Sequence, residues 1–202
     1  MNRDPDRVAL ELDAARMRQL LDELDQRLRA RGVKASAYLV GGAAMALGYG
    51  REELTPDIDA VVSHRAVVEE ARAMAAEHGL PGSWLNTNAA GWVPPRPAGA
   101  RRRPTDPGLT VHIAPADHVL AMKLVALRRK DRPDIRLLII ECGMQNAAAG
   151  DYADLLARVY EGEGLLGQML GVPEADDEAV RREALAIGEW AHDFAEPLRR
   201  SL

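Results

Sequence analysis

Apolar positions near the start of the chain recur at helical spacing. Residues 5–31 carry an apolar stripe on one face while Arg, Asp and Glu fill the other faces. The stripe consists of Met17, Leu20, Leu21, Leu24 and Leu28. Gly32 follows as a stop signal. The pattern predicts a helix over 5–31 that packs with one face and meets solvent with the other.

Shorter apolar runs follow this helix. They predict three strands, at residues 37–40, 57–62 and 109–113. The segments between the strands predict helices at 43–47 and 65–78. Residues 81–107 are rich in Pro, Gly, Asn and Arg, which predicts a long loop with little regular structure.

The C-terminal half of the sequence reads as helical throughout. Helices are predicted from Pro115 to about Arg129, over 131–142, over 151–160 and over 174–195. We therefore expect an α+β fold with a strand-helix-strand-helix-strand core. Residues 1–113 would form the N-terminal helix and core, and residues 114–202 a helical region packed on that core.

Composition narrows the class of protein. Of 202 residues, 47% are hydrophobic and 28% charged, a balance typical of globular proteins. Cys142 is the only cysteine, which excludes a disulfide framework and favours a reducing compartment. The sequence has no apolar run long enough to span a membrane and no signal-peptide core, so we expect a cytoplasmic protein without membrane contact.

Asp57 and Asp59 are the strongest candidates for chemistry. Two residues apart on a predicted strand, their carboxylates project from the same face. Phosphoryl transfer uses such pairs to hold Mg²⁺, which prefers hard oxygen ligands. The spacing alone is weak evidence, because Asp4 and Asp6 repeat it. Its context is more specific, because Gly41 and Gly42 follow the preceding strand and would let backbone N–H groups approach a phosphate.

Two segments resemble a known family. Residues 38–62, YLVGGAAMALGYGREELTPDIDAVV, resemble the signature of polymerase-beta-like nucleotidyltransferases, a Gly-Gly or Gly-Ser turn followed by Asp-x-Asp. Residues 115–138, PADHVLAMKLVALRRKDRPDIRLL, resemble the lysine helix and following Arg/Lys-Asp-x-x-Asp segment of the AbiE and MenT-type toxin nucleotidyltransferases. Together the two segments cover about a quarter of the chain.

The resemblance implies a small mixed-sheet nucleotidyltransferase core and a set of site residues. These would be Gly41 and Gly42 at the triphosphate, Asp57 and Asp59 at Mg²⁺, Lys123 on the nucleotide phosphates, and Asp134 as a further acid. It also implies a nucleoside triphosphate as substrate, RNA such as the tRNA 3′ end as acceptor, and a cognate antitoxin protein as partner.

The sequence departs from the family pattern at two places. Many relatives have Ser after the glycine where this chain has Ala43. The superfamily usually has a third carboxylate on a later strand, whereas the strand at 109–113 offers Thr110 and His112. Either the metal site is incomplete, or Asp134 or Asp131 takes part of that role.

Lys123 has two interpretations that do not depend on the family. It interrupts an apolar run over 119–127, and lysines are rarely buried without a partner. Its ammonium either snorkels out at the helix edge or points into a polar cleft, where it meets a triphosphate or an acid. Asp131 and Asp134 could instead be acids favoured by the dipole in the first turn of a helix.

Basic and aromatic residues are candidates for contacts with an RNA acceptor. The arginines at 101–103 and the basic run at 128–132 are either solvated faces or contacts to RNA phosphates. Trp84 and Trp92 flank the long loop and either stack a base or are partly buried. The five histidines show no convergent metal spacing, and no role is assigned to them.

Three functions remain open at this point. The first is an RNA-directed nucleotidyltransferase that acts as the toxin of a toxin-antitoxin pair. The second is an antibiotic-type nucleotidyltransferase for a small amine-bearing molecule, which would need an acidic acceptor pocket rather than basic walls. The third is a noncatalytic nucleotide-binding module, for which Ala43 and the missing strand acid are the evidence.

Overall fold

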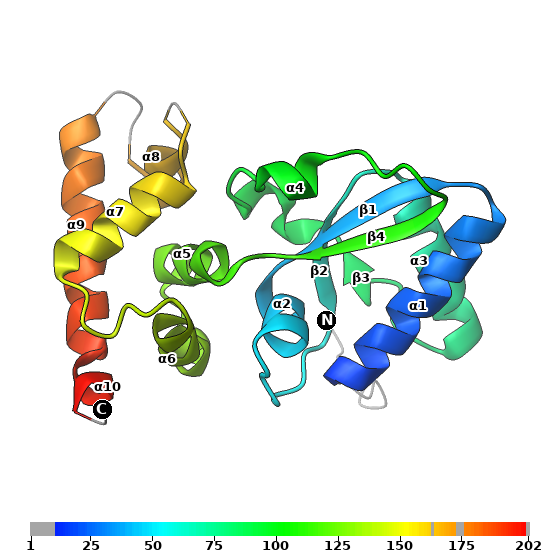
Figure 1. The fold of residues 1–202 in the computed structure, drawn as a ribbon, viewed down its shortest axis with the longest axis horizontal. Helices are drawn as coiled ribbons and strands as arrows, with labels where there is room; N and C mark the ends of the chain where they lie inside the picture. Colours follow the sequence, from blue (N-terminus) through cyan, green and yellow to red (C-terminus); the bar gives the residue numbers. More distant parts are fainter. Residues whose placement is uncertain (1–10, 163, 173–175, 201–202) are drawn as a thin grey trace, which may run out of the picture. The chain divides into compact units, whose positions relative to one another are not determined.

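The fold is α+β, as the sequence predicts (Figure 1). The computed structural model describes residues 11–162, 164–172 and 176–200. Within these ranges it contains ten α-helices, two 3₁₀ turns and one four-stranded sheet. The chain divides into two compact units, residues 1–91 with 98–113, and residues 92–97 with 114–202.

The sheet of the first unit is mixed. Its strands are β1 (Lys34–Leu39), β2 (Ile58–Val62), β3 (Leu85–Asn86) and β4 (Gly108–Ile113), in the order β3-β2-β1-β4. β1 runs antiparallel to β2 and parallel to β4, and β2 runs parallel to β3. The carboxyl ends of β1 and β4 and the amino ends of β2 and β3 therefore lie at the same end of the sheet.

Four helices accompany this sheet: α1 (Ala14–Ala30), α2 (Gly41–Gly48), α3 (Ala66–His78) and the short α4 (Ala98–Arg101). The first helix begins later than predicted: α1 starts at Ala14, and the described residues just before it are not helical. Residues 5–10 lie outside the described ranges, but Leu12 exchanges backbone hydrogen bonds of 2.8 and 3.1 Å with Thr55 instead of joining a helix. Asp13 caps α1 by accepting a 2.7 Å hydrogen bond from the Arg16 N–H.

The long loop predicted over 81–107 is irregular over most of its length, but it also contains short regular elements. This segment contains β3, α4 and a 3₁₀ turn, η1 (Asn88–Trp92). Trp84 fixes it, because its fully buried indole donates a 2.7 Å hydrogen bond to the Ala71 carbonyl and its own carbonyl accepts one from Ile58 N–H. Burial excludes Trp84 as a base-stacking residue, whereas Trp92 is 61% exposed.

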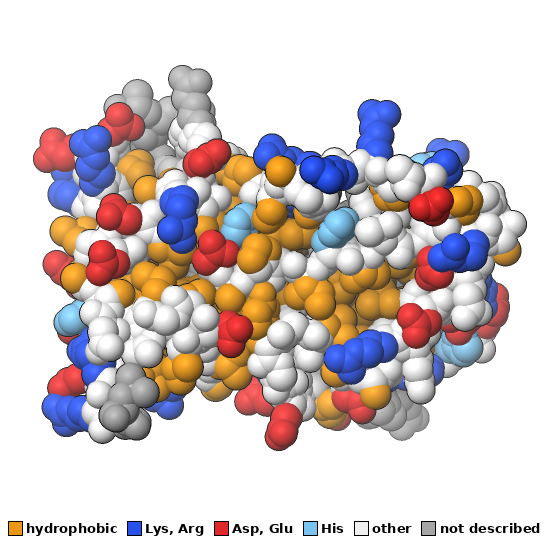
Figure 2. Space-filling model, in the orientation of Figure 1, with side chains coloured by type: hydrophobic (Ala, Val, Ile, Leu, Met, Phe, Trp, Pro, Cys, Tyr) orange, Lys and Arg blue, Asp and Glu red, His pale blue; other side chains and the backbone are white. Residues whose placement is uncertain are grey.

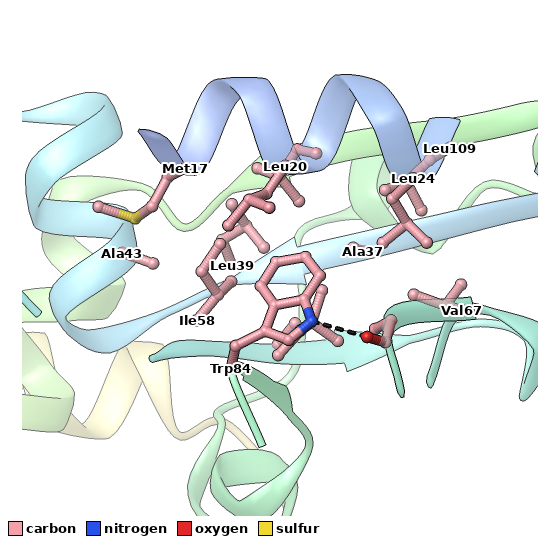
Figure 3. Packing of buried hydrophobic residues seen from close by; sticks show 14 of the residues in the cluster. Met17, Leu20, Leu24, Ala37, Leu39, Ala43, Ile58, Val67, Trp84 and Leu109 are labelled. Atoms are coloured by element: carbon pink, nitrogen blue, oxygen red, sulfur yellow. Dashed lines mark hydrogen bonds between the residues drawn. The ribbon is translucent and has the colours of Figure 1, made fainter. Parts of the chain in front are cut away.

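The core of the first unit lies between α1, α3 and one face of the sheet (Figure 3). Met17, Leu20 and Leu24 of α1 point toward Leu39 and the other buried strand residues. The predicted apolar stripe of this helix is therefore the face that it buries. Burial of one such aliphatic side chain contributes about 1.5–3 kcal/mol, which fixes the helix over the sheet.

The second unit is helical in its described residues. Its elements are α5 (Ala116–Ala126), η2 (Arg129–Asp131), α6 (Arg132–Glu141), α7 (Ala149–Val159), α8 (Leu165–Leu170), α9 (Asp177–Phe194) and α10 (Glu196–Arg199). α5 ends three residues earlier than predicted, because Leu127 adopts a left-handed conformation with φ 42°. α7 and α9 pack closely at Gly188, where a Cβ atom would come within 2.1 Å of the Ala149 carbonyl oxygen. In the described ranges, no helix combines the length and apolarity that a membrane crossing requires.

Candidate functional site

The glycine pair lies at the start of α2, just after β1. Gly41 has φ 60°, a left-handed conformation that favours glycine, and Gly41 and Gly42 form the first turn of α2. The N-cap residue of this helix is Val40, whose side chain forms no capping hydrogen bond. A Cβ atom on Gly41 would lie 3.4 Å from Asp59 Oδ2. The fold thus brings the glycine turn and the Asp59 carboxylate together.

Asp57 and Asp59 flank a core residue at the start of β2. Ile58 between them is fully buried in the hydrophobic core, while both aspartates are partly exposed. Strand alternation therefore turns the two carboxylates away from that core. Asp57 Oδ2 accepts a 3.0 Å hydrogen bond from Asn86 Nδ2, and Asn86 Oδ1 accepts one of 2.9 Å from Asn88 N–H.

The donor set fits Mg²⁺ bound together with a substrate. Mg²⁺ is usually held by one or two carboxylates plus water and substrate phosphates. Among the residues that the structure describes, no group of three or more His, Cys, Asp or Glu side chains could hold a metal ion. β4 presents Thr110 and His112 rather than a third acid. A Mg²⁺ at Asp57 and Asp59 would therefore need phosphate oxygens to complete its ligands.

Two further polar residues close around the glycine turn. A Cβ atom on Gly42 would lie 2.6 Å from Thr55 Oγ1 and 3.2 Å from Arg51 Nη1. Sequence reasoning missed both residues, although they lie inside the quoted signature segment. It also missed Asn86, which lies in the segment predicted to be irregular.

Lys123, Asp131 and Asp134 come together in the second unit. Lys123 Nζ lies 2.7 Å from Asp131 Oδ1 and 2.7 Å from Asp134 Oδ2, and Lys123 is only 7% exposed. The snorkelling interpretation is therefore wrong, and the ammonium meets acids. Asp131 precedes α6 without capping it through its side chain. Its carboxylate instead accepts the 2.7 Å hydrogen bond from Lys123 Nζ.

The basic segments are solvent-facing. The arginines at 101–103 are all exposed and belong to the first unit. Figure 2 shows Lys and Arg side chains standing out at the surface where Figure 1 places α4. The residues from Arg128 to Lys130 and Arg132 are exposed as well, in the second unit.

The second unit also carries an acidic hollow of about 560 Å³. It is lined by Ala116, Asp117, Cys142, Met144, Asp151, Asp154, Leu155 and Arg158. Arg158 Nη2 lies 3.6 Å from Asp117 Oδ2. Burial raises the pKa of the Cys142 thiol to about 11, so the thiol stays protonated at neutral pH and is a poor nucleophile.

Comparisons of the chain with protein-family models, curated proteins and solved structures found no match. In the first unit, two carboxylates and an uncapped helix start offer ligands for a cation and donors for an anion. That pairing of ligands is what a metal-bound phosphate requires.

Proposed function

We propose that this protein is a Mg²⁺-dependent nucleotidyltransferase that moves a nucleotide from a nucleoside triphosphate to an RNA acceptor. The observation that carries the proposal is the position of the Gly41–Gly42 turn against the Asp59 carboxylate, at the uncapped start of α2. Asp57 directly precedes β2, two residues before Asp59, so backbone alternation places its carboxylate on the same side as that of Asp59. A helix start favours phosphate, and the two acids favour the cation that accompanies it.

Each residue has a role in this proposal. The N–H groups of the glycine turn would hold the phosphates, and Asp57 and Asp59 would hold Mg²⁺. When bound, the ion neutralises charge on the phosphates and on the attacking oxygen. The chain itself orients the reactants, because Asn86 fixes the Asp57 carboxylate and the buried Ile58 fixes the strand.

Lys123 and Asp134 belong to the second unit, and their roles toward the nucleotide are proposed on the strength of the family resemblance alone. In the structure the Lys123 ammonium already contacts Asp131 and Asp134. Lysine has three donors, so a phosphate contact would have to use the third donor or replace one carboxylate. We propose that Asp134 positions the ammonium and that Lys123 contacts the nucleotide.

RNA is the preferred acceptor in this proposal because the first unit exposes three consecutive arginines at 101–103. Such a cluster offers bidentate contacts to phosphates even on a chain whose net charge is −5. By the resemblance, the acceptor would be the tRNA 3′ end, and the protein would act in the cytoplasm as the toxin opposed by a cognate antitoxin.

The test is a transfer assay with total RNA, Mg²⁺ and each labelled nucleoside triphosphate in turn. We expect label on small RNA with at least one triphosphate, and its loss when Mg²⁺ is chelated. An absence of label on RNA with all four triphosphates contradicts the RNA-directed activity. Triphosphate binding without any transfer would instead indicate the noncatalytic module, which the absence of an acid from β4 favours.

A second candidate acceptor is a small amine-bearing molecule of the antibiotic type. The observation that favours it is the acidic hollow of the second unit, which Asp117, Asp151 and Asp154 line together with the cationic Arg158. Such walls attract a cationic ligand and repel RNA. Label transfer to an aminoglycoside or lincosamide, but not to RNA, would select this candidate over the first.

A further inference from the structure

We propose that Arg51 and Thr55 are phosphate-binding residues of the triphosphate site. This inference rests on the proposed function and names two ligands that the family resemblance does not assign. Both side chains close over Gly42, the second residue of α2. Thr55 Oγ1 and Arg51 Nη1 would lie 2.6 and 3.2 Å from a Cβ atom at this position. A side chain at position 42 would therefore occupy the space beside the hydroxyl and the guanidinium.

The chain holds both residues in place. Thr55 is buried, and its backbone exchanges two hydrogen bonds with Leu12. The Arg51 N–H donates a 3.2 Å hydrogen bond to the Met45 carbonyl, so the chain leaving α2 runs back along that helix. The Arg51 side chain is only 19% exposed and lies 2.9 Å from Glu53 Oε2. These contacts order the two side chains before any ligand arrives, which lowers the entropic cost of binding.

The placement of Arg51 is electrostatically unusual. The start of a helix carries partial positive charge, so a cation beside it is unfavourable unless anions are present. The Asp59 carboxylate beside Gly41 supplies one anion, and Glu53 supplies another at the rim. A triphosphate would supply more negative charge at the same place. An arginine also offers a planar fork that matches two phosphate oxygens at once.

Thr55 supplies a hydroxyl beside the glycine turn, where this chain has Ala43 instead of serine. Its Oγ1 donates to the Asp57 carbonyl at 3.3 Å, which is long for a hydroxyl donor. A hydroxyl hydrogen rotates to suit its best acceptor. A phosphate oxygen near Gly42 would therefore draw this donor away from a weak backbone contact without moving the Thr55 backbone.

The test is equilibrium binding of a nonhydrolysable nucleoside triphosphate and of the matching monophosphate to the full chain with Mg²⁺. Arg51→Met should weaken triphosphate binding by about 10- to 100-fold, the value of one charge-assisted hydrogen-bonded contact. Arg51→Lys should recover part of that loss. Thr55→Val should cost roughly 5- to 10-fold and Thr55→Ser little. Monophosphate binding should change less in every variant.

Arg31→Met is the matched control, because Arg31 forms an ion pair with Glu70 between α1 and α3. It should bind triphosphate like the parent. If the parent binds triphosphate and both Arg51→Met and Thr55→Val bind it equally well, the inference is wrong while the proposed function stands. If the parent binds no triphosphate, both are wrong. If Arg51→Met does not fold, Arg51→Lys and Thr55→Val decide the matter.

Discussion

At the scale of single residues, Asp57 and Asp59 differ in what surrounds them. Asp57 is fixed by Asn86, whereas Asp59 lies beside the glycine turn. We expect Asp57→Asn and Asp59→Asn each to abolish label transfer. Their melting temperatures should match or exceed that of the parent, because each change removes repulsion between neighbouring carboxylates. Asp22→Asn, on the exposed face of α1, is the control. Full transfer by either site variant would contradict the metal role.

Gly42 gives a second prediction at this scale. Its φ is not in the left-handed region, and the atoms nearest to an added Cβ belong to the side chains of Thr55 and Arg51. Overpacking of this kind costs about 1–3 kcal/mol, and thermal unfolding should show it. Thr55→Ala removes the nearest atom, so the double variant should lose less stability than the sum of the two single changes. Gly82→Ala, with nothing within 4 Å of its added Cβ atom, should be neutral. An additive double variant would contradict the close contact.

Some site residues could be predicted from the sequence and others could not, for a physical reason. The spacing of Asp57 and Asp59 and the glycine pair is a local pattern, and strand alternation and helix starts are local too. Asn86 reaches Asp57 only because β3 pairs with β2. The position of Thr55 likewise depends on its backbone pairing with Leu12, which is distant in the sequence.

At the scale of elements, periodic segments were predictable and short ones were not. α3 and β4 match their predicted positions to within one residue, because each has a clear apolar pattern. β3 has only two residues, too few to show any alternation. Its existence depends on the buried Trp84, whose aromatic character alone does not indicate a strand.

The ion triad between α5 and α6 makes an element-scale prediction. Lys123→Met should destabilise the protein by about 3–5 kcal/mol, because it removes the cation that the partly buried Asp131 and the buried Asp134 share. Combining it with Asp131→Asn and Asp134→Asn removes the buried charge and should recover most of that stability. Urea unfolding of the single and triple variants measures both effects.

Transfer activity then separates two roles for Lys123. The triple variant has the packing of the parent without the ammonium. If Lys123 contacts the nucleotide, transfer should stay at least ~30-fold below the parent even after stability returns, since such contacts are worth about 2–4 kcal/mol. If a folded triple variant transfers label as well as the parent, the triad has only a structural role, in holding α5 and α6 together.

α1 and α3 are joined by a second charged cluster, which predicts a pH dependence. Hydrogen bonds from His78 and Arg27 lower the pKa of Glu23 below its ordinary value of 4.5. A carboxyl whose pKa is lower in the folded state stabilises the fold above its unfolded pKa and loses that effect as pH falls. The stability difference between the parent and Glu23→Gln should therefore be largest near neutral pH, at about 1 kcal/mol or less. It should shrink below about pH 4.5, and a difference that grows on acidification would contradict this account.

At the scale of the whole molecule, charge distribution matters more than net charge. The chain carries 31 acidic and 26 basic side chains, and a uniform spread of these charges would repel RNA. The basic side chains at 101–103 are consecutive and exposed, and they belong to the same unit as Asp57 and Asp59. A local basic surface on an acidic chain can attract one strand of RNA, while the acidic rest of the surface repels nucleic acid that would bind nonspecifically.

This distribution predicts how transfer to RNA responds to salt. Binding that neutralises RNA phosphates releases counterions, so acceptor affinity should fall steeply as the salt concentration rises. Arg101→Ala combined with Arg102→Ala removes two such contacts and should lower the slope of log affinity against log salt by roughly 1.4 for a single strand. The same double variant should leave triphosphate binding unchanged, because these arginines lie outside the glycine turn. Replacing two consecutive exposed arginines of α9, Arg181 and Arg182, provides a control matched in charge. A slope that the 101 and 102 substitutions do not alter would exclude this cluster as the RNA contact. A reaction that is insensitive to salt would instead favour a small-molecule acceptor.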